Sequence, residues 1–306
     1  MSRLGYLWLA VPALGLAELG LHVAFSRRAP SVEEWRELAE PVRRLKRPSD
    51  LVVVAPAWAE PIARHALGDG AFPLEQIARA DASSFARAVE VSALGARADE
   101  TRAWRVASEE KRGRFTLRVL ENPSPVVPKY RFVDHVRPPE LAVAVVTPER
   151  ETPCSFNEHA SVTAGGLHGH ATFPRERFQC PGGESSFVGV TVIDDQEYLP
   201  RRCIWAHPPE RGALHLRFRG VPLGSRLRAW AGLSYFLYRD GLGEPVTIAF
   251  DAEGRRLGTH RHQDEWGFRA FSFATPEVAG HTSDVEIVVS ADSAWGRDFC
   301  FVAETL

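Results

Sequence analysis

A run of 22 mostly apolar residues, 4–25, opens this 306-residue chain and most constrains what the chain can fold into. A helix needs about 20 apolar residues to cross the roughly 30 Å hydrocarbon core of a bilayer. Two ionisable residues in the run, Glu18 and His22, are four positions apart and therefore share one helix face. The run predicts one N-terminal transmembrane helix. The Glu18–His22 face is either an interfacial pair near the headgroups or a polar contact to another membrane helix.

A cleaved secretory signal peptide is the alternative reading of this segment. Arg3 would supply its charged start, and Gly15-Leu16-Ala17 offers a small-residue cleavage site. The hydrophobicity continues through Phe25, which favours an uncleaved signal-anchor. Arg27 and Arg28 follow the run, and the positive-inside rule taken alone would leave the body of the chain in the cytoplasm.

The cysteines point to the opposite side of the membrane. The chain has four, all in its C-terminal half and none in a C-x-x-C pair: Cys154, Cys180, Cys203 and Cys300. An even number confined to one region fits two disulfides, which persist only in an oxidising compartment. Of the three connectivities we favour 154–180 and 203–300; four reduced thiols in a cytoplasmic protein are the alternative. We therefore expect a single-pass protein of the cytoplasmic (inner) membrane, with its body in the periplasm or exterior.

Composition and motifs exclude several classes of function. The net charge of −2 gives no indication of a nucleic-acid partner, and 44% hydrophobic with 25% charged residues is ordinary for a globular protein. No P-loop, GxGxxG or GxSxG motif is present, and we expect no cofactor. Asp194-Asp195 follows an apolar run in the manner of a metal-binding acidic pair, although an exposed turn is the commoner explanation.

The fold class predicted from the periodicity is an α/β layer followed by an all-β sandwich (jelly roll), with one N-terminal transmembrane helix. The expected divisions are a transmembrane anchor at 1–30, a small α/β domain at 31–147, a Gly/Pro/His-rich lead-in at 148–184 and a β-sandwich at 185–306. Ser31 with Glu34 forms a capping box that opens a helix. The further elements expected in the α/β domain are helices at 32–46, 58–67 and 83–95 and strands at 51–55, 103–107 and 114–120.

The C-terminal part has short alternating or apolar runs separated by turn residues, without helical patterns, which is typical of a β-sandwich. The expected strands are 187–193, 203–206, 213–219, 226–232, 245–250, 268–273, 284–290 and 299–304.

Aromatic and polar residues of the sandwich suggest a ligand site. Flat aromatic rings flanked by bidentate polar groups are suited to gripping sugar rings, although aromatic residues also fill sandwich cores. The candidate ligand-binding residues are Trp266, Asp264, Arg239, Asp240 and Tyr235.

Histidines offer an alternative, a metal site. His159, His168 and His170 lie close together in the lead-in, and His260 and His262 alternate in the sandwich. Imidazoles at such spacing can hold a divalent ion, but no HExxH-like frame supports them. We expect no metal and keep the first three residues as the alternative.

Two resemblances to known families add to this reading. Residues 185–306 resemble a galactose-binding-like jelly roll, the fold of many carbohydrate-binding modules, in the strand series, in Arg239-Asp240-Gly241 and in the closing Phe299-Cys300-Phe301. This resemblance implies a carbohydrate-binding sandwich. Residues 35–56 are similar to the soluble segment after the last membrane helix of protein-mannosyltransferase-like bacterial membrane proteins. That similarity implies an outward-facing domain without transferase activity, because the many spans and the acidic catalytic loop are missing.

Three functional hypotheses follow. The first is a membrane-anchored, envelope-facing, non-catalytic protein whose sandwich binds carbohydrate or a protein partner. The second is an envelope enzyme, either glycan-modifying or a metal-dependent hydrolase. The third is an accessory subunit of a membrane complex, which grips another envelope membrane protein through Glu18 and His22.

Overall fold

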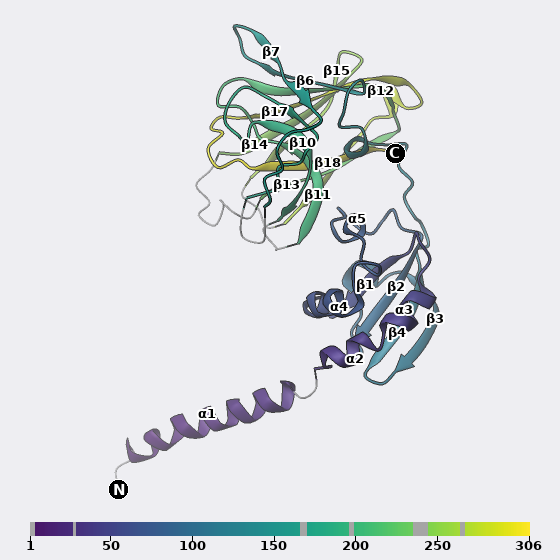
Figure 1. Ribbon diagram of the computed structural model, residues 1–306, viewed down its shortest axis with the longest axis vertical. Helices are drawn as coiled ribbons and strands as arrows, with labels where there is room; N and C mark the ends of the chain where they lie inside the picture. The colour runs from purple at the N-terminus through teal and green to yellow at the C-terminus, as the bar shows by residue number, and fades with distance from the viewer. Residues whose placement is uncertain (1–3, 27–28, 166–169, 196–198, 235–243, 264–266) are drawn as a thin grey trace. The chain divides into compact units, whose positions relative to one another are not determined.

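The computed structural model describes residues 4–26, 29–165, 170–195, 199–234, 244–263 and 267–306, with the side chains of the first helix described over 10–23 (Figure 1). The chain forms two compact units. Residues 1–76 and 85–125 make the first unit, and residues 77–84 and 126–306 make the second.

The apolar N-terminal run is helical. Helix α1 extends over Leu4–Ser26 and contains Pro12. Among the residues described with their side chains, no helix combines the length and the apolar character needed to cross a membrane. The membrane-spanning role of this segment therefore stays a prediction.

The first unit contains a four-stranded mixed sheet in the order β1-β2-β4-β3, with β1 and β2 parallel and the other pairs antiparallel. The strands are β1 (Leu51–Ala55), β2 (Arg87–Ala93), β3 (Arg105–Arg112) and β4 (Phe115–Glu121). The helices are α2 (Val32–Arg36), α3 (Ala39–Leu45), η1 (Ala57–Ala59), α4 (Glu60–Leu67), α5 (Leu74–Ile77) and η2 (Asp99–Thr101).

The capping box expected before the first helix of this unit is present. The Glu34 amide donates to the Ser31 hydroxyl at 3.2 Å, and the Ser31 amide donates to the Glu34 carboxylate at 2.7 Å. Helix α2 directs Trp35 into the core, where its ring meets that of Phe115 edge-on at 4.6 Å.

The helix predicted at 83–95 is wrong, because β2 occupies this region. Strand β2 lies between β1 and β4, and Ala88, Val89 and Val91 are completely buried. Glu90 and Ser92 interrupt the apolar residues of this strand yet are completely buried, and Glu90 accepts from the Arg118 guanidinium at 2.8 Å. The sequence therefore shows neither a continuous apolar run nor a polar face turned to solvent, so its periodicity does not indicate a strand.

The second unit is an antiparallel β-sandwich. Its eight-stranded sheet has the order β16-β13-β18-β11-β10-β9-β8, with β5 beside β18, and its six-stranded sheet has the order β15-β14-β17-β12-β6-β7. The first sheet consists of β5 (Tyr130–Arg131), β8 (Ser155–Asn157), β9 (Arg177–Gln179), β10 (Phe187–Asp194), β11 (Pro200–Ala206), β13 (Arg226–Leu233), β16 (Arg269–Ala274) and β18 (Phe299–Thr305). The second sheet consists of β6 (Leu141–Val146), β7 (Glu151–Pro153), β12 (Ala213–Pro222), β14 (Val246–Ala252), β15 (Arg255–His262) and β17 (Thr282–Ala291). Short helical turns lie at η3 (Phe132–Asp134) and η5 (Pro276–Val278).

Alternating residues of both sheets form one large core, which includes Leu216, Phe250 and Phe301. A second, smaller cluster contains Phe187, Trp205 and Trp230. Phe187 lies in β10, Trp205 in β11 and Trp230 in β13, and each is next to a residue of the large core. Because successive residues of a strand point to opposite faces, the smaller cluster lies on the other face of the eight-stranded sheet.

Both disulfides form with the connectivity favoured from the sequence. Cys154 is bonded to Cys180 across 26 residues, and Cys203 to Cys300 across 97 residues. The second bond joins the neighbouring strands β11 and β18, and both its cysteines are completely buried in the smaller cluster.

The compact units divide the chain at other places than the predicted 147/148 and 184/185 boundaries. Residues 126–147 belong to the sandwich through β5 and β6, and the lead-in at 148–184 supplies the edge strands β7 and β8 and the strand β9 beside β8. Residues 77–84, which we term the strap, also belong to the second unit.

Arginines of the eight-stranded sheet hold the strap. The Arg201 guanidinium donates to the Arg79 carbonyl at 2.8 Å. The Arg228 guanidinium donates to the Ser83 hydroxyl at 2.7 Å and stacks on the Trp230 ring at 4.5 Å. The strap is therefore fixed by backbone and side-chain contacts together.

Candidate functional site

Two connecting segments of the sandwich start and finish at the same end of its strands. Val246 at the start of β14 pairs with His262 at the end of β15, and Ala231 near the end of β13 pairs with Arg269 at the start of β16. The strands that precede and follow the segments 234–245 and 263–268 therefore have these ends on the same side of the sandwich, which we term the loop end.

The five candidate ligand residues belong to these two segments. Tyr235, Arg239, Asp240, Asp264 and Trp266 all lie outside the described residues, so their roles stay predictions. The described strand ends nevertheless bring the anchors of both segments to one place.

Buried polar residues gather at the loop end. The loop-end cluster consists of the buried residues Ser234, His262, Arg297 and Asp298 together with the partly buried His207. Asp298 is central, since its backbone carbonyl accepts from the Ser234 amide at 3.0 Å and its carboxylate lies 3.5 Å from His207 Nδ1. Arg297 is only 2% exposed and His262 only 1%.

Burial of an arginine and an aspartate side by side is costly unless each has partners. Sequence reasoning missed Arg297 and Asp298 because no spacing rule marks a charged pair just before a strand as buried. The only available signal was their position, directly before the closing Phe299-Cys300-Phe301.

The His260–His262 pair packs among aromatic rings. The His260 ring stacks on Phe271 at 4.0 Å, and the His262 ring meets Phe299 at 6.0 Å. Both imidazoles therefore occupy the aromatic edge of the core.

The described residues of the lead-in do not form the alternative metal site. The Ala160 amide donates to the Arg175 carbonyl, and Thr163 pairs with Phe173 in an antiparallel bridge. His159 and His170 therefore flank opposite ends of this paired segment. His168 lies outside the described residues. Over the part of the chain that the structure describes, no group of three metal-ligating side chains occurs.

In the acidic pair Asp194-Asp195 at the end of β10, Asp195 has a structural role. Asp195 is completely buried and accepts from the Leu199 amide at 3.0 Å and from the Arg201 guanidinium at 2.8 Å. Its carboxylate therefore braces the β10–β11 connection and the arginine that holds the strap.

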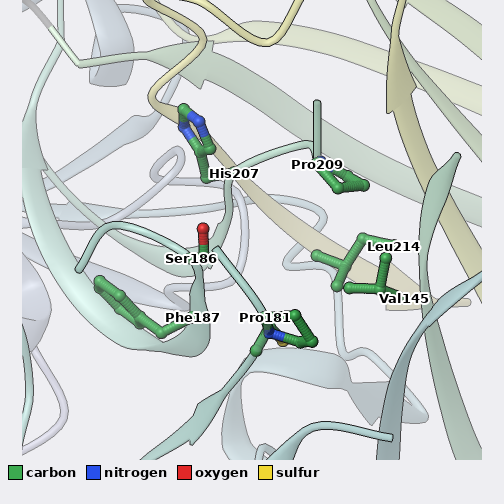
Figure 2. A pocket seen from close by; sticks show the side chains of 8 residues that line it. Val145, Pro181, Ser186, Phe187, His207, Pro209 and Leu214 are labelled. Atoms are coloured by element: carbon green, nitrogen blue, oxygen red, sulfur yellow. The ribbon is translucent and has the colours of Figure 1, made fainter. Parts of the chain in front are cut away.

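A small cavity near the loop end has no room for a ligand. It is lined by residues that include Cys180, Ser186 and His207, and it encloses about 10 Å³ (Figure 2). That volume is about what one water molecule requires. Figure 2 shows the imidazole of His207 directed away from the Ser186 hydroxyl, which does not suit a nucleophile–base pair.

The six-stranded sheet carries an ion network on its outer face. Glu286 accepts from Arg217 Nε at 2.7 Å and lies 2.9 Å from His215 Nδ1, and Arg217 also donates to both oxygens of Glu151, at 2.5 and 3.2 Å. Burial disfavours the charged form of Glu286, but the bonds from His215 and Arg217 outweigh it and lower the pKa of this carboxyl. The Arg217 guanidinium likewise lowers the pKa of Glu151. Because these groups satisfy one another, the network stabilises the sheet and offers few free donors to a ligand.

Comparison with known proteins identifies no family. No family model matches the chain, and no curated protein matches it. The similarity of residues 35–56 to mannosyltransferase-like proteins therefore stays a prediction.

Solved structures similar to the chain include carbohydrate-binding modules. One is a family 51 module from Clostridium perfringens in complex with methyl-galactose (10% identity, 38% of this chain and 81% of that chain, TM-score 0.28). Another is a family 16 module (15% identity, 38% and 82%, TM-score 0.23). A cyclase from Fischerella sp. TAU is also similar (14% identity, 60% and 92%, TM-score 0.26). We infer neither the site nor the function from these likenesses.

Proposed function

We propose that this chain is a membrane-tethered, envelope-facing, non-catalytic protein whose β-sandwich binds a glycan at the loop end. The tether is α1, and the binding residues are Tyr235, Arg239, Asp240, Asp264 and Trp266.

The observation that carries the glycan proposal is the common position of the two segment anchors. The pairs Val246–His262 and Ala231–Arg269 bring both segments with candidate residues to one end. An indole, a guanidinium and two carboxylates are the groups that would provide stacking together with paired donors and acceptors for vicinal hydroxyls. At the same end of the strands, Ser234 and Asp298 are buried, and the Ser234 amide donates to the Asp298 carbonyl.

The two disulfides support an oxidising compartment, because such bonds are rare where the cytosol keeps thiols reduced. The apolar composition of residues 4–25 supports anchoring in the inner membrane. Together they favour a single-pass protein with its body in the periplasm or exterior.

Glycan-array binding by the detergent-solubilised full chain tests the proposal. We expect the wild type to bind a subset of glycans, and Trp266→Ala with Asp264→Ala and Arg239→Ala to lose that binding. The control is Arg255→Ala, an exposed residue of the β14–β15 turn at the opposite end of these strands. Unchanged binding by the triple variant would refute the site, and an array with no bound glycan would refute the function.

A second candidate partner is another envelope membrane protein. Glu18 and His22 line one open hollow of α1 together with Gly15, so they share one side of the helix. Co-purification in mild detergent tests this role: partners that persist when Glu18 and His22 are both replaced by leucine would contradict it.

A further inference from the structure

Helix α4 and the turn before it present apolar side chains to solvent on one side. Trp58 is 57% exposed and Ile62 is 37% exposed, and Pro61 between them is also exposed. Trp58 and Ile62 are four residues apart and therefore lie on the same side. The opposite side is buried through Ala59 and Ala63, both completely covered. We term Trp58, Pro61 and Ile62 the α4 patch.

Of the ionisable residues of α4, Glu60 and Arg64 neutralise each other, and His65 is exposed in the last turn. Glu60 and Arg64 form an ion pair at 2.9 Å along the helix, and both side chains are at most about one-third exposed. The two charges of this pair cancel, so the pair adds no net charge beside the α4 patch.

The α4 patch belongs to the part of the chain that directly follows α1. Helix α1 ends at Ser26 and α2 begins at Val32, a connection that extends over at most about 21 Å. Helix α2 in turn packs against α4. A helix–helix packing distance is about 8–10 Å, so the connection and α2 together keep α4 within roughly 40 Å of the residue at which α1 ends.

We infer that the α4 patch inserts into the interfacial layer of the lipid bilayer that α1 enters. The inference rests on the proposed membrane anchoring. Tryptophan is enriched at membrane–water interfaces because its ring is apolar while its N–H is polar. A proline and a β-branched aliphatic residue beside it complete an uncharged surface of the kind that enters the headgroup boundary. The first unit is thereby held against the membrane by the patch as well as by the tether.

Tryptophan fluorescence of the full chain in nanodiscs tests the inference. The nanodiscs contain phosphatidylcholine brominated near the headgroup end of its acyl chains, and the same lipid without bromine is the reference. The variants are Trp8→Phe in the apolar run, Trp58→Phe, and Trp295→Phe as the matched control, since Trp295 is 67% exposed in the sandwich unit. We expect Trp58→Phe and Trp8→Phe each to remove about half of the bromine-quenched intensity, and Trp295→Phe to remove none. Ile62→Asp should lower the quenching of Trp58 while leaving that of Trp8 unchanged.

The outcomes separate this inference from the anchor on which it rests. If Trp8→Phe lowers the quenched intensity and Trp58→Phe does not, the patch stays in water and the inference is refuted while the anchor stands. If neither substitution changes it, α1 does not enter the bilayer, and both proposals are refuted.

Discussion

Removal of the Cys203–Cys300 disulfide is the sharpest test of how the sandwich is held together. The bond closes a loop of 97 residues, whereas Cys154–Cys180 closes one of 26. Chain-entropy arithmetic gives about 4.7 kcal/mol for the longer loop and about 3.5 kcal/mol for the shorter. Cys203 and Cys300 are also completely buried in the smaller cluster, while Cys154 and Cys180 are each 8% exposed. Cys203→Ala/Cys300→Ala should therefore destabilise the sandwich more than Cys154→Ala/Cys180→Ala does.

Urea unfolding followed by tryptophan fluorescence measures the difference, because Trp205 and Trp230 lie in the cluster that contains the 203–300 bond. We expect the free energy of unfolding to fall by about 4–5 kcal/mol in the first double variant and by about 1 kcal/mol less in the second. Equal losses, or a larger loss on removing 154–180, would refute the reasoning from loop length and burial.

Three further changes have defined outcomes. Ser31→Ala removes the side-chain cap of α2 and should cost about 1 kcal/mol in the unfolding of the first unit, as measured by thermal denaturation. Gly258→Ala places a methyl group against the Phe273 ring and should cost about 1–3 kcal/mol; an unchanged melting temperature would contradict that packing. Glu286→Gln should cost about 1 kcal/mol at pH 7 through its lost bond to Arg217. Because the folded pKa of Glu286 lies below its ordinary 4.5, this cost is present above pH 4.5 and is lost as the pH falls through the folded pKa; a cost that does not shrink as the pH is lowered from 4.5 would contradict the ion network.

The sandwich strands were predictable where apolar and polar residues alternate. Strands β10, β12 and β17 bury every second residue over 189–194, 213–218 and 284–289, as their sequences indicate. Strand β15 was missed because residues 255–262 contain mostly arginine, histidine and glycine, with no apolar alternation. Its register is set by pairing with β14, which sequence periodicity does not report.

Long-range packing decided the rest. The strap at 77–84 belongs to the sandwich because Arg201 and Arg228, more than a hundred residues later, bond to it. Likewise, Arg297 and Asp298 are charged residues that a sequence places on the surface by default. Their burial depends on the strands that meet at the loop end, so it could not be found from local spacing.

The redox state of the cysteines in living cells tests the central claim of an outward-facing sandwich most directly. Cells are quenched in acid, and the denatured protein is alkylated with a mass-tagged maleimide, with and without prior reduction. The account predicts no tags without reductant and four with it, because all four cysteines are bonded. Four tags without reductant would contradict the account, since such thiols belong to a reducing compartment and would move the whole body of the protein into the cytoplasm.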